Sequence, residues 1–382
     1  MNPASPNLSP ARDPLLFTPG PLTTSLSVKM AMLHDAGSWH ADFNALVARL
    51  REEILALGGV SREMGYECIP LQGTGTFGVE AVFASALPEN GKLLILANGA
   101  YGDRMVQMAK ALRRPHTVLT SAESATPDLS AVQAALNEDA TITHVSVVHC
   151  ETTTGILNPI PEIGGVVRAA GRRYIVDAMS SFGALPIDIP GSGIDFLISS
   201  ANKCLEGVPG FSFVLARRAA LLEAEGCARS LSLDLLGQLR GFERNGQFRY
   251  TPPTHAVLAF SQALRELADE GGIPARRARY ERNHAVLLAG MARLGWQPFL
   301  DPAVQSCIIT SFPYPAAPGF SFPVFYEFLS RRGFIIYPGK LTKVDTFRIG
   351  TIGRLFEADI LGLLGAIRES LREMNVPLNG AD

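Results

Sequence analysis

The sequence lacks the features that mark membrane-spanning, disulfide-bonded and secreted proteins. No apolar stretch approaches the roughly 20 residues needed to cross a bilayer, and the Pro/Ser-rich start, MNPASPNLSPARDPLL, has no apolar core of a signal peptide. The five cysteines form no CxxC pair and no Cys/His cluster at metal-ligand spacing. We therefore expect reduced thiols, no bound metal, no membrane association and a cytoplasmic location.

Charge is also scarce in this chain. Charged residues make up 18% of its 382 residues, hydrophobic residues make up 47%, and the formal net charge is −2. Basic residues are not gathered in one block, so we expect no nucleic-acid partner. The length and apolar content favour a globular protein with two domains of ordinary size.

Apolar runs alternate with helical segments in the first part of the chain. The runs 92–98, 143–151, 173–178 and 195–201 are typical of buried strands, and helical segments between several of them cover 103–114, 129–138 and 161–171. This alternation predicts an α/β fold with a mostly parallel sheet flanked by helices. Ligands bind such sheets beyond the carboxyl ends of the strands.

The pattern changes near Thr254. Long helical regions follow, then a weaker set of strands and helices that ends in a helix over 358–374. We expect a loose tail over residues 1–13, a large ligand-binding domain over 14–254 and a smaller α+β C-terminal domain over 255–382.

An acid and a lysine follow two neighbouring predicted strands. Asp177 ends the run RYIVDA, and Lys203 follows DFLISSA, between small polar residues and a Gly-Val-Pro-Gly turn. Alternative interpretations are a helix-capping aspartate and an ordinary surface lysine. The pair is, however, what pyridoxal phosphate (PLP) chemistry needs, because the lysine forms a Schiff base and the acid keeps the pyridine nitrogen protonated.

Three further segments could serve a phosphorylated, aromatic ligand. The glycines and hydroxyls of 73–78 precede a helical segment and could bind an anion. That segment matches GxGxxG, but the next strand ends in Asn98 rather than an acid, which disfavours a dinucleotide. Tyr101 could stack on a flat ring, and Thr153 could reach a ring oxygen, although a packed tyrosine and plain turn chemistry explain them nearly as well.

Arg348 lies inside the apolar segment TFRIGTIG. It could be an edge-strand arginine with its charge at the surface. It could equally form a two-point clamp for a substrate carboxylate or phosphonate.

Together these motifs resemble the fold-type I, class V PLP aminotransferases. The motifs LQGTGTFGVEAV, NGAYGDRMV, HCETTTGILNPI, YIVDAMSSFGA, SANKC, GVPGF, TPPTH and RIGTIG fall in the order of that family along nearly the whole chain. Several are similar to those of family members that act on 2-aminoethylphosphonate and pyruvate. The resemblance implies transfer of an amino group between these two, giving phosphonoacetaldehyde and alanine. Glu206 departs from the pattern, which has glutamine there.

The resemblance also implies a role for each candidate residue. Lys203 would carry the Schiff base and move the proton, and Asp177 would pair with the pyridine nitrogen. The cofactor phosphate would be bordered or bound by Gly75, Thr76, Phe77 and Asn202. Tyr101 would stack on the cofactor ring, and Thr153 would lie near the ring oxygen. Thr251 would contact the cofactor phosphate of a partner subunit in a homodimer, and Arg348 would bind the substrate.

Two alternatives share part of this pattern. Another class V aminotransferase, of the alanine–glyoxylate or serine–pyruvate type, would have the same cofactor residues and a different amino donor. A non-catalytic sensor that binds PLP or a phosphorylated metabolite would lack the lysine or the acid, and both are present.

Overall fold

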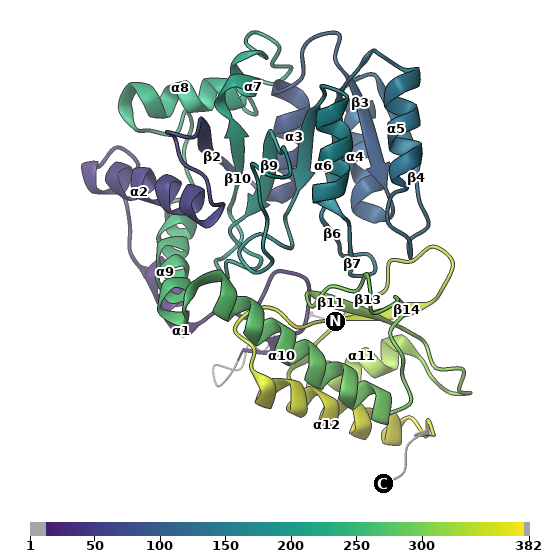
Figure 1. Ribbon diagram of the computed structural model, residues 1–382. Helices are drawn as coiled ribbons and strands as arrows, with labels where there is room; N and C mark the ends of the chain where they lie inside the picture. The colour runs from purple at the N-terminus through teal and green to yellow at the C-terminus, as the bar shows by residue number, and fades with distance from the viewer. Residues whose placement is uncertain (1–12, 378–382) are drawn as a thin grey trace, which may run out of the picture.

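A seven-stranded sheet forms the centre of the computed structural model, which describes residues 13–377 (Figure 1). In spatial order its strands are β2 (Tyr66–Gln72), β10 (Phe211–Arg217), β9 (Phe196–Ser200), β8 (Arg173–Asp177), β5 (Ile142–Val148), β3 (Lys92–Ala97) and β4 (His116–Thr120). β10 runs antiparallel to both of its neighbours, while β9, β8, β5, β3 and β4 pair in parallel. The predicted α/β fold with a mostly parallel sheet is therefore confirmed.

Helices cover both faces of this sheet, which explains the unbroken apolar runs of its strands. Successive residues of a strand point to opposite faces. In β3, Leu93 and Ile95 pack into one core, and Leu94 and Leu96 pack into the other. The first core is shared with α3 (Gly75–Ser85), α4 (Ala100–Ala111), α7 (Arg218–Leu222) and α8 (Leu235–Asn245). The second is shared with α2 (Ala41–Leu57), α5 (Leu129–Glu138), α6 (Ile160–Ala169) and α9 (Thr254–Glu270).

A smaller antiparallel sheet lies below the first in Figure 1. Its order is β11 (Ile309–Pro313), β14 (Thr346–Gly350) and β13 (Tyr337–Pro338). It packs with α10 (Gly272–Arg293), α11 (Phe322–Arg331) and α12 (Glu357–Glu373) around a core of its own. Aromatic side chains dominate this core, and the Trp296 and Phe347 rings meet edge to face with centroids 5.6 Å apart.

Two segments connect the two sheets. α9 buries Phe260 in the core of the large sheet, although it follows the boundary at 254 expected from the sequence. The short strand β1 (Leu15–Leu16) pairs with β12 (Phe334–Ile335), and Phe17 lies in the core of the small sheet. The division at residues 254 and 255 stays a prediction, and the expected tail lies outside the described residues except for Asp13.

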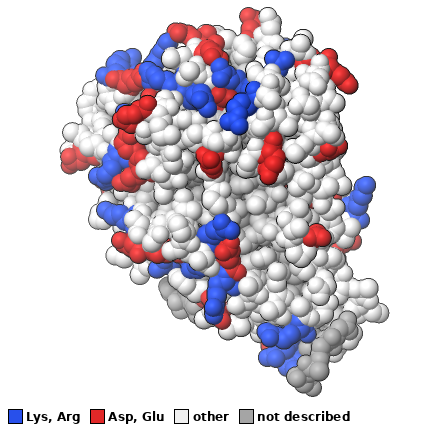
Figure 2. Space-filling view, in the orientation of Figure 1, with Lys and Arg blue, Asp and Glu red and all other residues white. Residues whose placement is uncertain are grey.

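The remaining elements are short: α1 (Leu26–Met30), η1 (Ala31–Leu33), β6 (Cys150–Glu151) and β7 (Ile156–Leu157). Basic and acidic side chains lie interspersed on the face seen in Figure 2, rather than in one block. Within residues 13–377, no helix combines the length and the apolar character that crossing a membrane requires.

Candidate active site

A cavity of about 240 Å³ opens at the carboxyl ends of β8 and β9. Asp177 is the last residue of β8, and Asn202 and Lys203 follow the end of β9. Because β8 and β9 are adjacent and parallel, their ends deliver these side chains to one edge of the sheet. Six of the predicted site residues line the cavity: Gly75, Thr76, Tyr101, Asp177, Asn202 and Lys203.

Lys203 is held against the segment that precedes α1. Its Nζ donates a hydrogen bond to the Pro19 carbonyl at 2.6 Å. The contact is close at Gly20, where a Cβ atom would lie 2.6 Å from Nζ and where φ is +116°, so that only glycine fits. Burial lowers the pKa of Lys203 below its ordinary value, and nearby Tyr101 and Asp177 oppose that shift only in part. The amine is thereby brought closer to the neutral, nucleophilic form.

Asp177 is a buried carboxylate that makes no ion pair within residues 13–377. Its Oδ1 accepts a hydrogen bond from the Met179 amide at 2.9 Å. Burial raises the pKa of Asp177 to about 6, and the nearby Glu151 adds to the shift. A buried carboxylate stays ionised at low free-energy cost only beside a cationic partner. The N–H of a pyridinium ring could be that partner.

The first turn of α3 faces the same cavity. The Phe77 amide donates to the Thr74 carbonyl at 2.9 Å, whereas the Gly75 and Thr76 amides have no acceptor among the residues described, and the helix dipole favours an anion there. Gly75 opens the helix, and a Cβ atom at this position would lie 2.3 Å from the Met179 sulfur. The Ser200 Oγ also lines the cavity, and it is buried without a hydrogen-bond partner among the residues described. A phosphorylated ligand would satisfy both sets of groups.

Tyr101 and Arg104 lie one turn apart at the start of α4. The Arg104 guanidinium lies 4.7 Å from the centroid of the Tyr101 ring, and its Nη1 donates to the Thr76 hydroxyl at 3.3 Å. Burial would raise the pKa of Tyr101, but the positive charges of Lys203 and other nearby groups outweigh burial and lower it. Sequence reasoning missed Arg104, although the spacing of three residues on one helix face could have revealed it.

Thr153 is not among the residues that line the cavity. Its hydroxyl donates to Glu151 Oε1 at 2.7 Å and accepts from the Ala100 amide at 2.9 Å, and the residue is fully buried. Glu151 Oε2 accepts from the backbone amides of Tyr101 and Gly102. Thr153 and Glu151 therefore fix the N-terminus of α4, and through it the Tyr101 side chain.

The other predicted residues lie around the cavity without lining it. Arg348 is buried, and its Nε and Nη1 donate to the carbonyls of Pro338 and Thr152 at 2.9 and 2.8 Å. Phe77 is 49% exposed, and Thr251 is also exposed.

Glu206, where the chain departs from the family pattern, is buried rather than exposed at the cavity mouth. Its Oε1 accepts from the Tyr280 hydroxyl at 2.6 Å and from Arg279 at 2.7 Å. The Tyr280 hydroxyl in turn accepts from the Gly353 amide at 3.1 Å. Glu206 thus ties the loop after Lys203 to the loop after β14.

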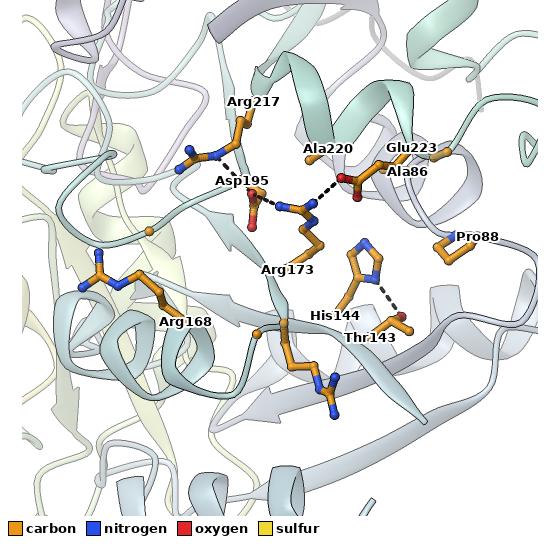
Figure 3. A pocket seen from close by; sticks show the side chains of 14 residues that line it. Ala86, Pro88, Thr143, His144, Arg168, Arg173, Asp195, Arg217, Ala220 and Glu223 are labelled. Carbon is orange, nitrogen blue, oxygen red and sulfur yellow. Dashed lines mark hydrogen bonds and ion pairs between the residues drawn. The ribbon is translucent and has the colours of Figure 1, made fainter. Parts of the chain in front are cut away.

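A larger cavity, of about 530 Å³, lies at the opposite edge of the sheet, where β5, β8 and β9 begin (Figure 3). Asp195, just before β9, lies 3.2 Å from both Arg173 and Arg217. Arg173 also pairs with Glu223. Burial lowers the pKa of His144 to about 3, so this histidine is neutral. The acids of this cavity are therefore already matched by cations.

Comparison with known proteins places this arrangement in a family. The family model described as aminotransferase class V matches residues 27–336, and the chain belongs to this family. A 2-aminoethylphosphonate–pyruvate transaminase of Syntrophobacter fumaroxidans is 51% identical over 368 residues, which cover 96% of this chain and 99% of that relative. A protein of the same name from Salmonella typhimurium is 52% identical over 363 residues, 94% of this chain and 98% of the relative.

A solved structure agrees with the fold. An alanine–glyoxylate aminotransferase from Nostoc sp. superposes with a TM-score of 0.86 at 25% identity, covering 97% of each chain. The resemblance to fold-type I, class V aminotransferases is thus confirmed, and PLP is the cofactor of this enzyme. The unpaired acid, the open helix terminus and the orphan Ser200 hydroxyl fit that cofactor.

Proposed function

We propose that this enzyme transfers the amino group of 2-aminoethylphosphonate to pyruvate, giving phosphonoacetaldehyde and L-alanine, in phosphonate catabolism. One observation carries the proposal. Asp177 and Lys203 lie in one cavity of a chain that is 51–52% identical, along nearly its whole length, to proteins named for this reaction.

Each reactive side chain has a defined role in this proposal. PLP, when bound, supplies a conjugated ring that accepts the electron pair left by proton removal. Lys203 Nζ takes the proton from the substrate carbon that bears the amine, and later returns it to the second reacting carbon. The Asp177 carboxylate accepts the N–H of the ring nitrogen and keeps that nitrogen protonated.

Binding is assigned to the groups around these two. The first turn of α3, Gly75 to Phe77, and Asn202 hold the phosphate, and Tyr101 stacks on the ring. Thr153 acts near the ring oxygen through its hold on the start of α4. Arg348 receives the acidic end of either substrate, because a guanidinium can pair with two oxygens of a phosphonate or a carboxylate. One site can then serve both half-reactions in turn.

We further propose a cytoplasmic homodimer in which Thr251 reaches the cofactor phosphate of the partner subunit. In support, large apolar side chains remain exposed at one end of the chain. Leu26, Leu33 and Trp39 are 72%, 79% and 80% exposed. Several large apolar side chains exposed within one short segment are more typical of a protein–protein contact than of free surface.

The decisive experiment is an absorbance titration of the purified, PLP-loaded protein with 2-aminoethylphosphonate. We expect the visible band of the lysine-bound cofactor to disappear, a band of the aminated cofactor to grow, and pyruvate to reverse the change. Alanine should give the aminated form as the reverse half-reaction, and serine serves as the comparison donor.

The same titration can contradict the proposal. If serine, or alanine with glyoxylate as the preferred acceptor, converts the cofactor and the phosphonate does not, the fold and cofactor stand and the substrate class is wrong. If none of these amines converts the bound cofactor, the proposed reaction is wrong.

A further inference from the structure

A second cation contacts the ring of Tyr101, which lines the cavity, and no prediction from the sequence assigned this cation a role. Lys340 Nζ lies 4.9 Å from the centroid of the Tyr101 ring. Lys340 is exposed and lies two residues after the end of β13. Its charge acts on the site as well, because it contributes to lowering the pKa of Tyr101 and, after burial, that of Lys203.

The turn that carries Lys340 is fixed at both ends. On one side, the Arg348 Nε binds the Pro338 carbonyl, and the Gly339 amide donates to the Thr346 carbonyl at 2.8 Å. A Cβ atom at Gly339 would lie 2.1 Å from the Thr346 Oγ1, so the turn can approach β14 this closely only with glycine. On the other side, the Thr342 amide and hydroxyl donate to Glu123.

Arg348 is connected to Lys340 through the backbone. Its Nε anchors the turn that presents the lysine by donating to the Pro338 carbonyl, two residues before Lys340. Two backbone carbonyls already occupy the Nε and one N–H of Nη1. The remaining N–H groups of Arg348 can neutralise one negative charge.

The two substrates differ in charge at the end that Arg348 would bind. A carboxylate carries one negative charge, whereas a phosphonate loses a second proton near neutral pH, as phosphate monoesters do. A single guanidinium leaves that second charge unmatched, and an unmatched charge is costly at a partly buried site. A second cation beside Tyr101 would strengthen the binding of the phosphonate and leave the binding of the carboxylate largely unaffected.

We infer that Lys340 is a specificity-determining residue that supplies the second positive charge for the dianionic end of the amino donor. This inference rests on the proposed function, because it concerns the same site and the same donor. Two groups of this chain then have separate roles, since Arg348 binds either substrate and Lys340 discriminates between them.

The test compares Lys340→Gln with Lys340→Arg and with Lys343→Gln, a matched control on the same exposed loop. We expect Lys340→Gln to raise the KM for 2-aminoethylphosphonate by about ten- to hundredfold, with the KM for pyruvate changed by less than about threefold. Lys340→Arg should restore much of the loss, and Lys343→Gln should match the wild type.

A second readout does not depend on turnover. Methylphosphonate and acetate are titrated calorimetrically into the PLP-loaded wild type and each variant. We expect Lys340→Gln to weaken methylphosphonate binding selectively, and the rise of wild-type affinity with pH, as the phosphonate loses its second proton, to flatten in this variant. Equal weakening of both anions, or no weakening, would overturn the inference.

The two proposals fail differently. A wild-type enzyme that does not convert 2-aminoethylphosphonate contradicts the proposed function. The calorimetric difference between methylphosphonate and acetate still decides the role of Lys340 in that case.

Discussion

A buried aspartate lies at each end of the parallel strands, and only one of the two forms ion pairs among the residues described. Asp195, at the amino end, lies between two arginines and accepts the Tyr174 amide at 2.9 Å. Asp177, at the carboxyl end, is equally buried and has no ion pair among the residues described. The cavity at the amino end is the larger of the two, at about 530 against 240 Å³.

The comparison shows that neither volume nor the number of charges identifies the site. Charges that are paired within the protein have their partner already and do not require a ligand. Charges that are buried without a partner reduce stability, and they fit a site whose partner is a ligand. The carboxyl end meets the second description at both Asp177 and Lys203, whose pKa values are shifted toward their neutral forms.

The largest effect is expected at Lys203. Lys203→Ala should reduce turnover by roughly 10⁴-fold or more, because the group that moves the proton is lost. The melting temperature of the cofactor-free variant should equal or exceed that of the wild type, because an amine with a lowered pKa no longer has to be buried. Near-normal turnover would exclude the assigned role, and Lys343→Ala is the matched control.

The second prediction concerns Asp177. Asp177→Asn should lower turnover by about a thousandfold, because the electrostatic partner of the ring nitrogen is lost. In the cofactor-free protein the same change should be stabilising at about pH 8, by roughly 2–3 kcal/mol. The measurement is the urea unfolding free energy of wild type and variant across pH.

The sign of this pH dependence follows from the direction of the shift. The carboxyl binds its proton more tightly in the folded state, with a pKa of about 6, than in the unfolded chain. Wild-type stability therefore falls as pH rises from about 4 to about 6, and the advantage of the variant should disappear below about pH 4. An advantage that is independent of pH would show that the carboxylate is not the cause.

A smaller loss is expected at Thr251, which the proposal assigns to the neighbouring subunit's site. Thr251→Ala should lower cofactor affinity by about tenfold, the effect of one hydrogen bond to a charged phosphate. Mixed dimers provide the sharper measurement. A dimer of one Thr251→Ala and one Lys203→Ala subunit should contain one fully intact site, whereas an action within the same subunit leaves none.

The smallest effect on turnover is expected at the amino end. Asp195→Asn should leave kcat within about twofold, because Asp195 and its two arginine partners do not line the cavity at the carboxyl ends of the strands. A loss of activity that exceeds the loss of folded protein would mean that the two ends of the sheet are coupled.

Much of this organisation could be predicted from the chain alone, since it depends on local patterns. β3, β8 and β9 lie within the predicted apolar runs, and β5 begins one residue before its run. The strand that ends at Asp177 and the strand that precedes Lys203 are enough to place these two residues. The direction of β10 could not be predicted. An apolar run buried on both faces carries no sign of its orientation, and the antiparallel pairing is decided by neighbours distant in sequence.

The two missed residues of the site differ in cause. Lys340 looks like an ordinary surface charge in the sequence, because tertiary structure brings the Tyr101 ring to it. The contact of Arg104 with the same ring is local to α4, and its spacing could have revealed it. Thr153 shows the converse. Its motif is recognisable in the sequence, but its hydroxyl turns inward to Glu151, the last residue of β6, whose buried carboxylate binds the start of α4.

The hydrogen bond between Lys203 and Pro19 has a consequence for how the molecule is assembled. The segment that contains Pro19 is held in turn by the Gly350 amide, which donates to the Phe17 carbonyl at 2.9 Å, and by the pairing of β1 with β12. The segment that contains Pro19 is synthesised first, whereas β12 and β14, which hold it, are synthesised last. The Lys203 amine therefore gains its hydrogen-bond partner only when the chain is almost complete. A nascent chain that still lacks β14 can form the large sheet, but Pro19 is not yet held in place beside Lys203.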